Sequence, residues 1–170
     1  MHTEPTPEFL TALNAHTGIL YKVANIYCSR PEDRSDLIQD FILEFWRAWP
    51  RFEPARAKVS TWMYRIAMKV AINAHRGASR SIRAADALPN PLIDLAAADA
   101  ELVNGDDDLH ALHQLLARFD AIGRSLILLY LEGYSHAEIA EITGLSVSNV
   151  ATRIQRIKHS LSSDFKGIST

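Results

Sequence analysis

The chain of 170 residues contains one cysteine, Cys28, and lacks several features that would assign it to a specialised class. A single thiol excludes an intramolecular disulfide and a zinc site made from several cysteines. Cys28 lies in an apolar-periodic stretch, so we expect a buried thiol. No apolar run is long enough for a transmembrane helix, and the first residues lack the basic and apolar segments of a signal peptide. These absences predict a protein of the reducing cytoplasm that is not inserted into a membrane.

The sequence also lacks the alternating pattern of β-strands, whereas apolar residues recur at helical spacing through most of it. We therefore expect an all-α protein made of two small helical domains, at residues 7–80 and 108–165, joined by an acidic linker at residues 81–107. The expected helices are Pro7 to Cys28 with Thr6 as N-cap, Pro31 to just before Pro50, Thr61 to Gly77 with Ser60 as N-cap, one beginning at Asp106–Asp108 and reaching Phe119, Leu126 to Leu131, Ser135 to Gly144, and Val147 to Leu161 with Ser146 as N-cap.

Positive charge is scarce overall, since the net charge is −2, but it is unevenly distributed. Between Arg51 and Arg83 there are eight Lys or Arg and one acid, Glu53. Residues 84–108 hold seven acids and no base, and residues 147–166 hold four bases and one acid. Because a phosphate-binding protein needs local rather than global positive charge, two basic patches flanking an acidic connector favour nucleic-acid binding.

The stretch from Ser135 to Leu161 predicts a helix-turn-helix. Ser135 and Glu138 match a capping box, and Gly144 supplies the left-handed conformation that ends the first helix. In the second helix one apolar stripe faces inward, formed by Val150, Ile154, Ile157 and Leu161. The opposite face carries groups suited to base edges and phosphates in a major groove, namely Ser148, Asn149, Thr152, Arg153, Arg156 and His159. The alternative to DNA binding is an ordinary helical hairpin whose polar face is only in contact with solvent.

The helix expected from Thr61 carries a second basic stripe. Outward positions hold Arg65, Lys69, Asn73 and Arg76, while Trp62, Ile66, Val70 and Ala74 are expected to face inward. The aromatic residues Phe52, Trp62 and Tyr64 surround this stripe. Positive charge follows a phosphate backbone and aromatic faces stack on unpaired bases, so the stripe suits single-stranded or melted DNA. Core packing is the alternative role for the aromatic residues.

Four segments in this order resemble an extracytoplasmic-function (group 4) sigma-70 family factor that contains only sigma domains 2 and 4. The first three are Asp36-Leu37-Ile38-Gln39-Asp40, Phe45-Trp46-Arg47-Ala48-Trp49-Pro50-Arg51-Phe52 and Ser60-Thr61-Trp62-Met63-Tyr64-Arg65-Ile66-Ala67. The fourth is the helix-turn-helix, Tyr134 to Leu161. The resemblance covers about residues 9–80 and 108–164.

This resemblance implies a transcription-initiation factor and not an enzyme, with no cofactor and no metal. The implied partners are core RNA polymerase, through its β′ clamp helices and β flap, promoter DNA, and an anti-sigma factor. The resemblance implies that polymerase is bound by Asp36, Leu37, Gln39 and Asp40. It implies that the −10 promoter element is contacted by Trp62, Arg65, Lys69, Asn73 and Arg76. It implies that the −35 element is contacted by Ser148, Asn149, Thr152, Arg153 and Arg156. Members of the family frequently have Glu at the position of Asp40 and Asn at the position of Lys69.

Two other classes of function are the alternatives. A stand-alone helix-turn-helix regulator would bind DNA tightly without polymerase, and the polymerase-docking segment argues against it. A metal enzyme would have to use His110 and His113, which can share one helix face, but catalytic zinc needs about three protein ligands and no third ligand is evident.

Overall fold

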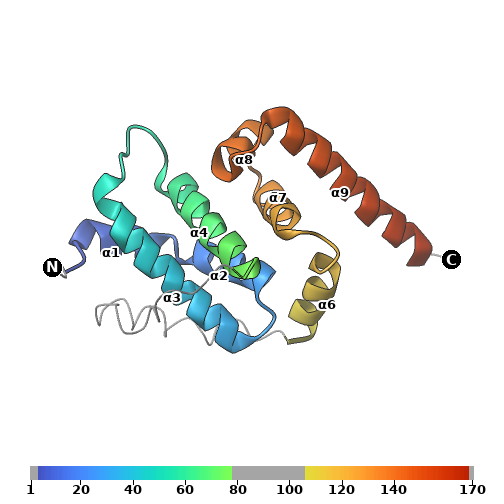
Figure 1. Ribbon diagram of the computed structural model, residues 1–170, viewed down its shortest axis with the longest axis horizontal. Coiled ribbons are helices and arrows are strands. Elements are labelled where there is room, and N and C mark those ends of the chain that lie inside the picture. The colour runs from blue at the N-terminus through green and yellow to red at the C-terminus, as the bar shows by residue number, and fades with distance from the viewer. Residues whose placement is uncertain (1–3, 78–105, 169–170) are drawn as a thin grey trace.

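The computed structural model describes residues 4–77 and 106–168, and within these ranges every regular element is a helix (Figure 1). The expected all-α fold is confirmed. The acidic linker expected at residues 81–107 lies almost entirely outside the described residues. The elements are α1 (Pro7–Ala15), α2 (Thr17–Tyr27), α3 (Pro31–Ala48), the short 3-10 helix η1 (Trp49–Arg51), α4 (Val59–His75), α6 (Asp106–Leu116), α7 (Ala121–Leu131), α8 (His136–Thr143) and α9 (Val147–Ile168).

The first expected helix is two helices, so the prediction of one helix from Pro7 to Cys28 was wrong. The Thr6 hydroxyl caps α1 by accepting from the backbone N–H of Phe9 at 3.2 Å, as expected. The chain then turns at His16, which has φ −126° and ψ 20° and is not helical. The turn folds α1 back, so that Phe9 packs against Trp49 with ring centroids 5.5 Å apart. The break between α1 and α2 therefore goes together with the packing of Phe9 on Trp49, and apolar periodicity in the sequence does not reveal it.

Helices α3 and α4 complete an N-terminal unit formed with α1 and α2. Pro31 occupies the first turn of α3, and Pro50 lies in η1, where the helix ends. Helix α4 begins two residues earlier than expected, so Lys58 rather than Ser60 is its N-cap. Its most buried residues are Thr61, Met63, Tyr64, Ala67, Met68 and Ala71, whereas the stripe expected to face inward, from Trp62 to Ala74, is only half-buried. Because α4 contacts α2 and α3 and also α8, its buried face is wider than one stripe.

Helices α6–α9 form the C-terminal unit. Helix α7 begins at Ala121, five residues before the expected start, because the Asp120 carboxylate caps it by accepting from Gly123 N–H at 2.7 Å. Helix α9 extends beyond Leu161 to Ile168. Leu116, Leu126, Leu129, Ile139 and Val150 are at most 1% exposed and form the centre of this unit.

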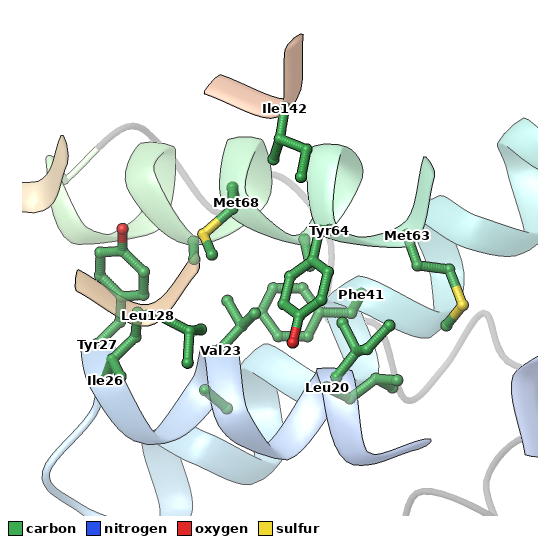
Figure 2. Close-up of a cluster of buried hydrophobic side chains, with 14 of the residues drawn as sticks. Leu20, Val23, Ile26, Tyr27, Phe41, Met63, Tyr64, Met68, Leu128 and Ile142 are labelled. Atoms are coloured by element: carbon green, nitrogen blue, oxygen red, sulfur yellow. The ribbon is translucent and has the colours of Figure 1, made fainter. Parts of the chain in front are cut away.

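The two units pack against each other through α2 and α4 of the first and α7 and α8 of the second. Figure 2 shows Leu128 of α7 beside Tyr27 and Ile142 of α8 above α4, near Met68 and Tyr64. Leu128 is 8% exposed and Ile142 is 4% exposed, so these side chains are buried where the units meet. The two cores are continuous.

We predict opposite stability changes for two glycine-to-alanine substitutions. A Cβ at either Gly144 or Gly18 would meet no atom within 4 Å, but Gly144 has φ +78° whereas Gly18 has no positive φ. Gly144→Ala should lower the free energy of unfolding by about 1 kcal/mol because a side chain strains the left-handed conformation. Gly18→Ala should raise it by about 0.5 kcal/mol by restricting the unfolded chain. Urea unfolding followed by circular dichroism measures both, and equal effects would refute the role of backbone conformation.

Candidate nucleic-acid interface

The helix-turn-helix is built by local hydrogen bonds that the sequence predicts. Ser135 Oγ accepts from Glu138 N–H at 3.2 Å, and the Glu138 carboxylate accepts from Ser135 N–H at 2.8 Å. These hydrogen bonds lower the pKa of Glu138. Gly144 ends α8 with φ +78°, and Ser146 Oγ accepts from Asn149 N–H at 3.2 Å to cap α9. The capping box, the glycine turn and the second cap are therefore confirmed, and they fix the angle at which α9 leaves the turn.

Helix α9 has the two faces that its sequence predicts. Val150 and Ile154 are buried, and Leu145 and Ile157 pack against the core from partly buried positions. The opposite face presents Ser148, Asn149, Thr152, Arg156 and His159 as exposed side chains. This face is long, polar and positively charged, which suits contact with base edges and phosphates in a major groove.

Arg153 differs from its neighbours on α9 because the protein itself holds it. Its Nε donates to Asn149 Oδ1 at 3.1 Å, and its Nη1 lies 3.6 Å from Asp120 Oδ2. Asp120 is also the N-cap of α7, so one carboxylate links the start of α7 to the outer face of α9. The arrangement orients Arg153 and Asn149 relative to the rest of the unit.

The basic stripe of α4 is exposed as predicted. Arg65, Lys69, Asn73 and Arg76 are all exposed side chains along this helix. Next to its beginning lies an aromatic cluster in which the Trp62 ring centroid is 5.1 Å from that of Phe52 and 5.8 Å from those of Phe45 and Trp49. Half-buried Trp62 thus helps to build the surface on which the stripe begins.

Tyr64 is not part of this exposed surface, which corrects the expectation that it surrounds the basic stripe. Its side chain is 2% exposed and its hydroxyl donates to Glu132 of the other unit at 3.4 Å. Burial, with Glu132 nearby, raises the pKa of Tyr64, so the phenol stays protonated and acts as a donor.

The α4 stripe faces the helix-turn-helix across the junction between the units. Arg65 Nη2 lies 3.0 Å from Glu141 Oε1 of α8. A cavity of about 360 Å³ beside this ion pair is lined on the α4 side by Arg65, Lys69 and Asn73, and on the α8 side by Glu141, Ile142 and Thr143. The structure therefore brings the predicted −10 residues against the element that positions the predicted −35 residues.

The predicted polymerase-binding residues lie on α3 at different depths. Asp36 is exposed, Gln39 and Asp40 are half-buried, and Leu37 is 1% exposed within the core. Leu37 therefore supports α3 from inside the unit. The polar residues are the ones that a partner would meet first.

The polar contacts between the units were not predicted from the sequence. Tyr27 Oη donates to Ala121 O at 2.6 Å and is also hydrogen-bonded to Ser125 Oγ. Lys22 Nζ lies 2.7 Å from Glu132 Oε2. Burial raises the pKa of Tyr27 to about 12, whereas burial and the nearby Arg124 lower the pKa of His75. No local sequence pattern predicts the contacts of Tyr27 with Ala121 or of Lys22 with Glu132, because the residues in each contact are more than 90 positions apart.

The described residues contain no group of three or more His, Cys, Asp or Glu placed to hold a metal ion. The two histidines considered for a metal site have other partners, because His113 Nε2 donates to Asn25 O and His110 is hydrogen-bonded to Gln114. Cys28 is half-buried rather than fully buried. Among the described helices, none is long and apolar enough to cross a membrane.

Comparison with known proteins agrees with this arrangement. The family model Sigma-70 region 2 matches residues 13–81, which span α2 to α4, and the model Sigma-70, region 4 matches residues 109–161, which contain the helix-turn-helix. RNA polymerase sigma factor SigV of Bacillus subtilis is 31% identical over 150 residues, covering 86% of this chain and 84% of SigV. ECF RNA polymerase sigma factor SigC of Mycobacterium tuberculosis is 31% identical over 140 residues, covering 81% of this chain and 73% of SigC.

A solved structure has a similar fold. It is CnrH, in a complex with the cytosolic domain of CnrY, with a TM-score of 0.67 and 24% sequence identity over 94% of this chain and 88% of the CnrH chain. The two family models match the two halves of the chain in the order that the resemblance implies. The chain therefore belongs to the sigma-70 family of RNA polymerase sigma factors, within its extracytoplasmic-function group.

Proposed function

We propose that this sigma factor docks on core RNA polymerase through α3, reads the −35 element with α9 and holds melted −10 DNA with α4. The observation that carries the proposal is the presence of two exposed faces, one on each unit. The face of α4 is basic and is formed by Arg65, Lys69, Asn73 and Arg76, and the face of α9 is polar and is formed by Ser148, Asn149, Thr152 and Arg156, with half-buried Arg153 beside them. Each face lies within the sigma region whose model matches it. The polymerase supplies the chemistry, and this chain supplies binding and orientation.

The two faces differ in ways that suit two forms of DNA. Helix α9 projects from a capped turn and carries short polar side chains near its beginning, which suits base edges in a duplex groove. Helix α4 lies next to a cluster of aromatic rings, and Lys69 and Asn73 follow Arg65 along its exposed side. Aromatic rings with a basic track are typical of single-strand binding, so this surface fits the melted strand.

Control by an anti-sigma factor is also part of the proposal. The similar fold of CnrH was solved in a complex with the cytosolic domain of another protein, CnrY, which supports a protein partner for this fold. The contact of the C-terminal unit with the β flap of polymerase stays a prediction.

The first test is transcription of genomic DNA by purified core polymerase, with and without the protein, with RNA 5′ ends determined by sequencing. We expect a small set of new start sites that depends on both components. Asp40→Lys should reduce their use at least about tenfold, because reversing a charge at a docking surface costs several kcal/mol. Glu8→Lys makes the same charge change at an exposed position of α1 and should leave start-site use unchanged.

Tight binding to duplex DNA without polymerase, together with no new start sites, would contradict this function and favour a stand-alone regulator. Equal loss of activity in the Asp40 and Glu8 variants would contradict docking through α3.

The −35 role of α9 is tested by removing the same charge from its two sides. Arg156 and Lys158 are two residues apart, so they lie about 200° apart around the helix. Arg156 is on the polar outer face, whereas Lys158 Nζ lies 4.3 Å from the ring centroid of Tyr130. Arg156→Ala should weaken binding of holoenzyme to a promoter identified by the transcription test by about tenfold, since such contacts contribute about 1–3 kcal/mol. Lys158→Ala should change it less than twofold, and the reverse order would exclude this face as the reader.

A further inference from the structure

The first residue of α9, Val147, is apolar and exposed beside the polar side chains proposed to read DNA. We propose that Val147 contacts the 5-methyl group of a thymine in the −35 element and so determines part of the promoter specificity. The inference rests on the proposed function of α9. It adds an apolar contact to a face whose other proposed readers are polar, and it requires an A·T pair at one defined position of the duplex.

The exposure of Val147 is not explained by packing within the protein. Its side chain is 50% exposed, whereas that of Val150, three residues further along α9, is fully buried. The other large apolar side chains between residues 147 and 163 are buried or half-buried, namely Ile154, Ile157 and Leu161. Valine also forms helix less readily than alanine or a long unbranched residue. Neither core packing nor helix formation therefore accounts for a valine at this position.

The place of Val147 in the helix directs its methyl groups toward the end that would enter the groove. Side chains of a helix tilt toward its N-terminus, so those of the first turn project toward the helix start. Recognition helices place this end in the major groove, where their first residues meet base edges. Ala151, one turn after Val147 and half-buried, lies on the same side of α9. The two residues thus form an apolar margin next to the polar face.

The start of α9 is held by hydrogen bonds, so the methyl groups of Val147 are positioned before DNA binds. Ser146 Oγ accepts from Asn149 N–H at 3.2 Å, and the carbonyl of Ser146 accepts from Val150 N–H at 3.0 Å. In addition, a valine side chain has one strongly preferred rotamer in a helix. Contact with DNA therefore removes little conformational freedom at this position.

The polar neighbours of Val147 form hydrogen bonds within α9, which limits what they can read. Thr152 Oγ1 donates to the carbonyl of Ser148 at 2.9 Å, and Asn149 Oδ1 accepts from Arg153 Nε at 3.1 Å. A bidentate contact with adenine needs both the oxygen and the nitrogen of an asparagine amide. Asn149 can make that contact only by sharing the oxygen that holds Arg153. An apolar contact at Val147 supplies discrimination that these polar groups do not.

Thymine carries the group that matches Val147. Its 5-methyl group is exposed in the major groove, where the edges of adenine, guanine and cytosine present hydrogen-bonding groups instead. Burial of one such group changes binding by about fourfold. Because this gain comes from removing apolar surface from water, added salt does not screen it. The contact is therefore separable from phosphate contacts, which weaken as salt is added.

The deciding experiment removes the methyl group from the DNA and, separately, truncates the side chain that contacts it. Holoenzyme binding is measured on a promoter identified by the transcription test, with each −35 thymine of either strand replaced in turn by uracil. Uracil pairs with adenine as thymine does but lacks the 5-methyl group. The proteins compared are the wild type, Val147→Ala and a control, Leu131→Ala, which truncates an exposed apolar side chain at the end of α7.

We expect uracil at one thymine position to weaken binding of the wild-type and Leu131→Ala proteins by about fourfold. Val147→Ala should weaken binding to the thymine promoter by a similar factor, and uracil should then cause less than about a twofold further loss, because the two changes remove the same contact. The ratio of binding to the thymine and uracil promoters should be the same at about 50 mM and about 200 mM salt, although binding itself falls.

The methyl contact is overturned if no thymine position is sensitive to uracil, or if Val147→Ala is as sensitive as the wild type. It is also overturned if Leu131→Ala loses the sensitivity in the same way. If Arg156→Ala still weakens binding in these cases, the proposed reading of the −35 element by α9 stands. If the holoenzyme gives no new start sites, or binds without regard to the −35 sequence, the proposed function is wrong and the thymine contact is overturned with it.

Discussion

Both units meet on α2, because this helix carries a broad apolar face that helices of each unit help to bury. Val23 and Ala24 are fully buried, and Leu20, Ile26 and Tyr27 are nearly so. A broad apolar face needs more than one neighbouring helix to remove it from water. Helices α3 and α4 cover one part of it, and α6 and α7 of the other unit cover the rest. The N-terminal unit is therefore completed by the C-terminal unit, and this shared burial determines where α8 and the α4 stripe meet.

The same constraint explains why the residues proposed to read DNA are held differently in the two units. In the C-terminal unit, Asp120 and Asn149 hold Arg153 within the unit, so α9 is ordered by its own neighbours. In the N-terminal unit, Arg65 is held by Glu141 of the other unit. One proposed reader is organised within its own unit, whereas the other is paired with a residue of the other unit. Both ion pairs are partly exposed, so added salt weakens each of them.

Features that depend on neighbouring residues were predictable from sequence. The Thr6 cap, the Ser135–Glu138 capping box, the left-handed Gly144 and the Ser146 cap each involve residues within four positions and a rule of backbone hydrogen bonding. The exposed stripes of α4 and α9 followed from helical periodicity. The turn at His16 and the buried position of Tyr64 were not predictable, because packing against distant residues accompanies both. The contacts between the units carry no local signal, so the ion pair of Arg65 with Glu141 is visible only in the folded chain.

The junction between the units also relates the proposed binding surfaces to one another. Arg65, Lys69 and Asn73 of the α4 stripe line the cavity beside α8, whereas the exposed residues of α9 and Asp36 of α3 lie outside that lining. Leu128 and Ile142 are buried at this junction, so a change in the arrangement of the units would expose their apolar surface to water. A partner that binds α3 or the outer face of α9, as proposed, therefore leaves this buried contact in place, whereas a ligand that follows the whole α4 stripe meets it.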